Sequence, residues 1–163
     1  MFLWFVGASL VVAWVVFRDP AIDHRVLVAG ALLPDVVDAP FGGARVAHTL
    51  VASAALLTAV MLATRGHRHA RRRWLFLPVG TFVHLVADGI WGRAETFWWP
   101  FLGGGLDGPL PSLDRGIAAV VLQELAGLAA IVWFVRTFGL AADRAARTNF
   151  LRTGRLSRNR VDG

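Results

Sequence analysis

Apolar residues form long runs along the chain, and short charged segments separate those runs. The first run covers Phe2–Phe17 without a charged residue, and further runs cover 46–64, 74–91 and 117–140. Each approaches the roughly 20 residues that a helix needs to cross a membrane. The first run lacks the basic start of a signal peptide, which favours an uncleaved span. The pattern predicts an all-α polytopic membrane helix bundle with about four transmembrane helices.

A fifth apolar segment, 26–41, differs from the others because Pro34 and two aspartates interrupt it. The part between Arg25 and Asp35 would measure roughly 15 Å as a helix, about half of the hydrocarbon thickness. Irregular backbone at that depth is tolerated only against protein or a wet cavity. The segment is therefore expected to form a short or re-entrant helix inside the bundle.

Charge indicates the orientation. All 17 basic residues are arginine, and most lie in 65–73 and in 136–160. The positive-inside rule places these two segments in the cytoplasm, so that 18–45 and 92–116 face outward. We expect a membrane-embedded domain over 1–140 and an Arg-rich cytoplasmic tail over 141–163, in a multi-pass protein of the plasma membrane.

The net charge of +6 also raises the question of nucleic acid. The basic residues lie beside apolar segments and lack interleaved aromatic residues for base stacking, so no nucleic acid is expected. The expected partner is membrane lipid, including anionic lipid of the inner leaflet for the Arg-rich tail. A homo-oligomer stays open.

Six ionisable side chains fall at similar depth near the outward side of the expected spans. Such residues are costly in a membrane and mark functional sites. His84 and Asp88 are four apart, so they project from one helical face. Without cysteine, a metal would be held by His, Asp or Glu, which favours zinc, manganese or iron. The six residues are Asp35, Asp38, His48, His84, Asp88 and Glu124.

Each of these residues also has a simpler interpretation. An aspartate after Pro34 can cap a helix, and the pair of His84 and Asp88 can tie helices together. Arg45 can anchor at the interface or bind a substrate phosphate. Arg25 can pair with a neighbouring acid or stabilise a developing anion. Glu124 can form an interior hydrogen-bond pair with its neighbour or reach the site.

Four short stretches resemble the YdjM-like family of predicted membrane-bound metal-dependent hydrolases in order and spacing. They read DHRVLVAGALLPDVVDAP (23–40), RVAHT (45–49), HLVADGIW (84–91) and WPFLG (99–103). The resemblance implies a helical membrane protein. Many relatives carry Asp-x-Asp where this chain has Asp-x-x-Asp, so which aspartate binds metal stays open. The implied metal ligands are Asp35, Asp38, His48, His84 and Asp88.

The His-x-x-x-Asp pattern is also similar to that of zinc phospholipase C and P1 nuclease, which indicates a phosphoester substrate. The leading hypothesis is a hydrolase with a divalent metal, zinc first, that acts on a phosphoester or lipid-linked ester at the outer membrane–water interface. Arg45 or Arg25 would stabilise the anion that develops. The alternatives are a structural polar cluster without catalysis and a small transporter or ion-handling protein.

Overall fold

The computed structural model describes residues 1–103, 106 and 115–157, and within that part of the chain the secondary structure is helical, as expected. Short 3-10 turns supplement the helices: η1 (Ala39–Phe41), η2 (Val46–His48) and η3 (Ile90–Gly92). The helices are α1 (Phe2–Phe17), α2 (His24–Asp38), α3 (Leu50–Ala63), α4 (Arg68–Trp74), α5 (Phe76–Ala87), α6 (Ala94–Phe97), α8 (Ile117–Thr137) and α9 (Arg144–Thr153).

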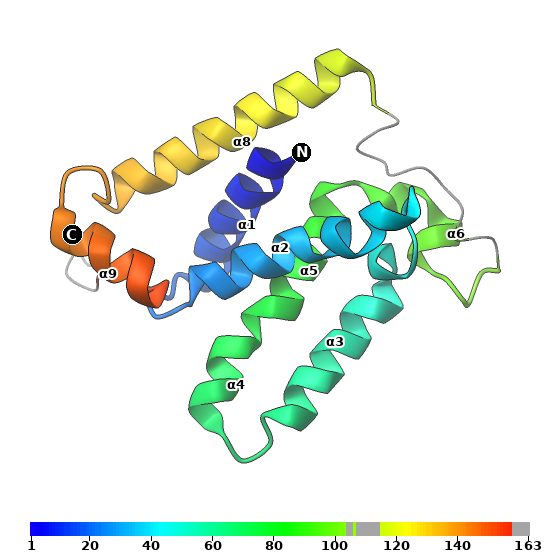
Figure 1. Cartoon of the computed structure of the whole chain (residues 1–163), viewed down its shortest axis with the longest axis horizontal. Coiled ribbons are helices and arrows are strands. Elements are labelled where there is room, and N and C mark those ends of the chain that lie inside the picture. Colours follow the sequence, from blue (N-terminus) through cyan, green and yellow to red (C-terminus); the bar gives the residue numbers. More distant parts are fainter. Residues whose placement is uncertain (104–105, 107–114, 158–163) are drawn as a thin grey trace.

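The helix α2 lies at the centre of the fold. It packs against α5 on one side and against α1 on another, and α1 in turn packs against α8 (Figure 1). The N-terminal end of α2 lies beside α9, while its C-terminal end lies toward α6 (Figure 1). The molecule therefore has an α9 end and an α6 end, and α2 connects them.

Glycine permits the two closest helix crossings. A Cβ atom on Gly30 of α2 would overlap with the carbonyl oxygen of Leu77 on α5, and one on Gly80 would overlap with the α2 backbone. Gly7 and Gly127 make the corresponding contact between α1 and α8. Small residues allow helix backbones to approach closely, as at helix crossings in membranes.

Pro34 lies inside α2 but does not end it. Proline has no N–H, so the carbonyl of Gly30, four residues earlier, loses its helical donor. The hydroxyl of Thr81 on α5 donates to that carbonyl at 3.1 Å. The 15-residue helix therefore continues without reversal, over roughly 22 Å at 1.5 Å per residue. The segment thus forms one helix that packs against α5 and α1.

The segment before α2 lies at the α9 end, close to the arginines of α4. Asp19 pairs with Arg72 at 2.6 Å, and Asp23 pairs with Arg73 at 3.0 Å. The expectation that 18–45 lies on one outward face, away from 65–73, is therefore wrong. Because α2 runs from one end to the other, its two flanking segments lie at opposite ends.

Asp23 forms ion pairs with two arginines at the α9 end. Its carboxylate accepts hydrogen bonds from the backbone and guanidinium of Arg25. Burial alone would raise its pKa, but the hydrogen bond from Arg25 and the charges of Arg25 and Arg73 hold the pKa of Asp23 below its usual value. The acids of this segment thus compensate the arginines beside them.

The first part of the C-terminal tail packs on the helical body. Ala146 of α9 and Leu156 are buried in a cluster with Phe134 of α8 and with Phe138, which follows α8. The backbone N–H of His24 donates to the Gly154 carbonyl at 2.9 Å. Residues 158–163 of the expected tail lie outside the described residues.

One helix in the described part of the chain, α8, is long and apolar enough to cross a membrane. It has 21 residues, and an 18-residue window within it has a mean hydropathy of 2.0. Because 11% of that window is buried, most of this helix is exposed at the surface of the molecule. The helices α1 and α3 are apolar but have 16 and 14 residues. The run 74–91 is divided at Leu75, and its helix α5 ends at Ala87. The structure thus establishes one candidate span, and multi-pass topology remains a hypothesis.

Substitution of Gly30 by alanine should destabilise the fold, because the added methyl group overlaps with the α5 backbone. Overpacking of this kind costs about 1–3 kcal/mol, and thermal unfolding in detergent measures it. Gly92→Ala is the control, since nothing lies within 4 Å of a Cβ at that position. Equal melting temperatures for the two variants would contradict the close crossing.

Candidate metal centre

Three side chains from separate elements converge near the C-terminal end of α2. Nε2 of His48 lies 3.4 Å from Nε2 of His84 and 3.5 Å from Oδ1 of Asp35. Nε2 of His84 lies 3.6 Å from the same carboxylate oxygen. The three atoms form a nearly equilateral triangle, and both histidines are fully buried. We call Asp35, His48 and His84 the triad.

Local structure positions each member. Asp35 follows Pro34 on α2, and His84 lies in the last turn of α5. His48 ends the turn η2, directly before Thr49, whose hydroxyl caps α3 by accepting from the Ala52 N–H at 3.0 Å. The cap separates η2 from α3, so His48 is held at the helix entrance.

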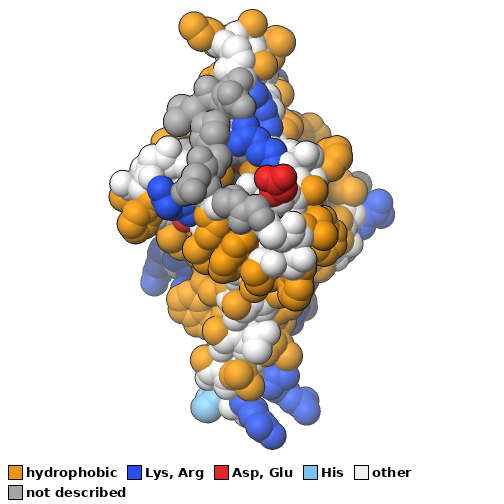
Figure 2. Space-filling view, turned by 90° about the vertical axis from the view of Figure 1, so that its right-hand side faces the viewer, with side chains coloured by type: hydrophobic (Ala, Val, Ile, Leu, Met, Phe, Trp, Pro, Cys, Tyr) orange, Lys and Arg blue, Asp and Glu red, His pale blue; other side chains and the backbone are white. Residues whose placement is uncertain are grey.

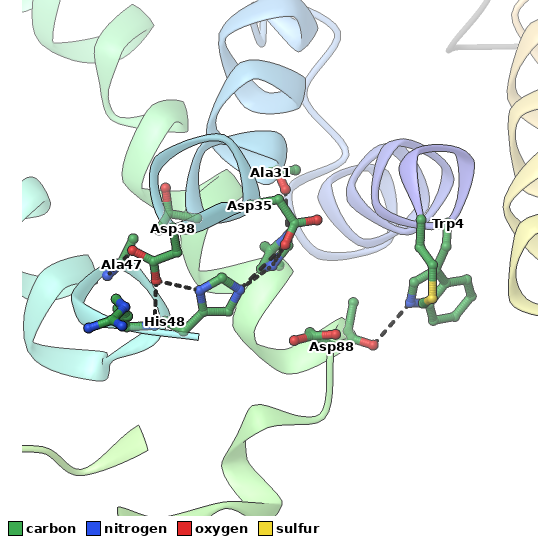
Figure 3. A network of polar contacts seen from close by, with 12 residues as sticks. Trp4, Ala31, Asp35, Asp38, Ala47, His48 and Asp88 are labelled. Carbon is green, nitrogen blue, oxygen red and sulfur yellow. Dashed lines mark hydrogen bonds and ion pairs between the residues drawn. The ribbon is translucent and has the colours of Figure 1, made fainter. Parts of the chain in front are cut away.

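The outer nitrogen of each histidine has a partner that only accepts. Nδ1 of His48 donates to a carboxylate oxygen of Asp38 at 2.7 Å, and Nδ1 of His84 donates to the Ala31 carbonyl at 2.7 Å. Each Nδ1 therefore carries a proton, and in its neutral form each ring presents the lone pair of Nε2. Figure 3 shows His48 between Asp38 on one side and Asp35 on the other. Metal-binding histidines are oriented in this way.

Backbone N–H groups hold the Asp38 carboxylate in turn. The N–H of Arg45 donates to it at 2.8 Å, and that of Ala47 donates at 3.3 Å. Asp38 thus organises the loop between α2 and α3 around His48. Its contacts indicate that it orients a ligand, while Asp35 presents its oxygen to the triad.

The triad could hold one metal ion. Ligands at about 2.0–2.1 Å from a tetrahedral ion lie roughly 3.3–3.4 Å from one another, close to the three observed separations. A cation or a shared proton between the two Nε2 atoms and the carboxylate oxygen would stabilise this close approach. Two histidines with one carboxylate occur in catalytic zinc sites and in non-haem iron sites.

Asp88 lies beside the triad and not within it (Figure 3). Its side chain is 1% exposed, and neither carboxylate oxygen has a hydrogen-bond partner among the described residues. Nη1 of Arg115 is 3.8 Å from Oδ1 of Asp88. A buried carboxylate without hydrogen bonds is costly unless a ligand or ion satisfies it.

The residues expected to assist catalysis are scattered. The guanidinium of Arg45 donates to the Phe41 carbonyl at 3.3 Å, near the loop of the site. Arg25 lies at the α9 end, where it donates to the Arg152 carbonyl at 2.7 Å. Glu124 of α8 accepts from the Leu3 N–H at 3.2 Å. The described contacts join neither Arg25 nor Glu124 to the triad.

Sequence reasoning missed two partners of the site. The Ala31 carbonyl is a backbone group, and nothing in the residue type indicates its role. Arg115 precedes α8 next to a Gly- and Pro-containing stretch without hydrophobic periodicity, so depth arguments could not place it. The proximity of Pro34 is the one available signal for Ala31, because a proline perturbs the carbonyls of the preceding turn.

Substitution of Asp38 by asparagine should weaken metal binding about 10- to 100-fold, as expected for the partner of a ligating histidine. An asparagine amide can donate to Nδ1 and thereby favour the tautomer that protonates Nε2. Competition with a chelator measures the affinity, and Asp19→Asn at the α9 end is the control. Unchanged affinity in Asp38→Asn would contradict the orienting role.

No family model matches the chain, and no curated protein or solved structure gives a significant match. The resemblance to the YdjM-like family therefore rests on the four sequence stretches alone.

Proposed function

We propose that the chain is a membrane-bound metal-dependent hydrolase that acts on a phosphoester or lipid-linked ester. The triad of Asp35, His48 and His84 would hold the metal, with zinc favoured over manganese or iron. The observation that carries the proposal is a pair of buried histidines whose Nδ1 atoms are both hydrogen-bonded and whose Nε2 atoms both lie near the same oxygen of Asp35.

The donor set suits catalysis because catalytic sites use three protein ligands and keep a further position open. A divalent ion supplies Lewis acidity, which activates water and polarises an ester. Asp35 contributes negative charge, and Asp38 keeps His48 in the ligating tautomer. Asp88 lies beside the triad, and its carboxylate oxygens accept no hydrogen bond from the described residues, so it is the candidate to accept a proton from the attacking water.

Surface chemistry supports a location at a membrane. Hydrophobic side chains cover much of the α6 end (Figure 2), where Trp91, Phe101 and Leu102 are strongly exposed. Such aromatic rims occur at membrane–water interfaces. The proposal makes the chain a multi-pass protein of the plasma membrane, with the arginines of α4 and α9 in the cytoplasm and the triad facing outward.

An apolar hollow supports a lipid-linked substrate. It has a volume of about 430 Å³ and lies between α1 and α5, with Ala8, Val12 and Phe82 in its lining. Its lining extends to Trp4 and Ala87, and Ala87 directly precedes Asp88. An apolar chain in this hollow would place its polar head beside the triad.

A structural cluster is the second candidate. The bonds from His84 to the Ala31 carbonyl and from His48 to Asp38 join α2 to α5 and to the α3 entrance, which would stabilise the fold without catalysis. A transporter would use the same cluster as a binding station beside the proline-containing helix. Metal content and turnover distinguish the three functions.

We expect near-stoichiometric zinc, manganese or iron in detergent-purified protein and none in His84→Ala, because that variant loses one of three ligands. His67→Ala is the control, since His67 is exposed and bonds the Arg65 carbonyl. Elemental mass spectrometry measures the metal. A phosphodiester substrate should turn over in the wild type, stop with chelator and resume when metal is returned.

Wild-type protein without metal, even after reconstitution with divalent ions, would contradict the proposed hydrolase and favour the structural cluster. Metal without turnover, together with solute flux in proteoliposomes, would favour the transporter.

A further inference from the structure

The guanidinium of Arg115 is held beside the triad at the end of α5. Nη2 donates to the backbone carbonyl of Asp88, and Nη1 donates to Oε1 of Gln123 on α8 at 3.1 Å. The Arg115 side chain is 26% exposed, so it is fixed by protein on one side and reachable from outside on the other. The contacts therefore present a positioned cation at the rim of the site.

Gly89 gives the guanidinium its space. The residue has a φ of +67°, and a Cβ there would lie 3.2 Å from Nη2 of Arg115. Glycine adopts this left-handed conformation without penalty and leaves the carbonyl of Asp88 accessible. The absence of a side chain at Gly89 therefore leaves space for the Arg115 guanidinium at the end of α5.

The balance of charges at the site indicates what the Arg115 guanidinium could bind. Asp35, Asp38 and Asp88 together carry three negative charges when ionised, one more than a divalent ion neutralises. An anionic substrate then needs a further positive charge in a buried site, because isolated charges are costly there. Arg115 lies 3.8 Å from Asp88, whereas Arg25, expected from the sequence to stabilise an anion, lies at the α9 end.

We propose that Arg115 forms the oxyanion subsite of the metal centre and binds a non-bridging oxygen of a substrate phosphoryl group beside the triad. The proposal rests on the proposed function and specifies its substrate as an anionic phosphoester. A guanidinium suits this task because its planar fork matches phosphate oxygens. Within the described part of the chain, its hydrogen bonds use two of the five N–H donors.

The test uses inorganic phosphate as the probe and the full-length, metal-loaded protein in detergent. Calorimetry or ³¹P resonance broadening measures phosphate affinity. We expect Arg115→Ala to bind phosphate about 10- to 100-fold more weakly, as for loss of a charge-assisted hydrogen bond. Arg115→Lys should fall between the two, because it keeps the charge and loses the fork.

The matched control is Arg93→Ala, because the charge of Arg93 also acts on Asp88. Its phosphate affinity should stay near that of the wild type. If both alanine variants lose affinity equally, a general positive field binds phosphate and the subsite is overturned. Metal stoichiometry and melting temperature are measured in every variant, so that loss of the fold is not mistaken for loss of the subsite.

A further variant keeps the test decisive if Arg115→Ala does not fold. Gln123→Leu removes the partner of Nη1, so it should weaken phosphate binding about fivefold, as for a neutral hydrogen bond. Wild-type phosphate affinity in metal-loaded Arg115→Ala would overturn the subsite, as would metal-loaded wild type that binds no phosphate. Absence of metal from the wild type would instead overturn the proposed function on which the subsite depends.

Discussion

The close backbone contact between α2 and α5 is the constraint on which the rest of the site depends. Gly30 and Gly80 bring the two helices together, and Pro34 leaves the Gly30 carbonyl without its helical donor. At this distance Thr81 reaches the carbonyl of Gly30, and His84 reaches that of Ala31. A wider crossing would leave the carbonyl of Gly30 unsatisfied and His84 without its fixed tautomer. The close packing of α2 and α5 therefore also fixes the orientation of His84.

The polar residues form layers around that contact. The triad lies innermost, and the Ala31 carbonyl and Asp38 hold the outer histidine nitrogens. Backbone N–H groups of the α2–α3 loop then hold Asp38. Buried polar networks stabilise a single arrangement when each member is satisfied, and they are costly when one is not. Asp88 departs from this rule, and such departures occur at functional sites.

Sequence patterns predicted the helical class and the approach of Asp35, Asp38, His48 and His84, because hydrophobic runs give the depth of each residue along its helix. The same depth argument included Glu124, which contacts the start of α1 instead. They did not predict the course of α2. The hydropathy of 26–41 suggested half a crossing, whereas tertiary contacts carry the helix through Pro34. The Arg count placed 18–45 apart from 65–73, and it could not show that Asp19 and Asp23 pair with the arginines of α4. Arg115 depends on a tertiary contact with the end of α5, for which no local pattern exists.

The order of these residues along the chain has a consequence for biosynthesis. The triad and the two groups that orient its histidines all come from residues 31–84, whereas Arg115 and α8 follow later. Synthesis proceeds from the N-terminus. All three candidate ligands are therefore synthesised before the helix that covers α1. Arg115 is synthesised after every candidate ligand.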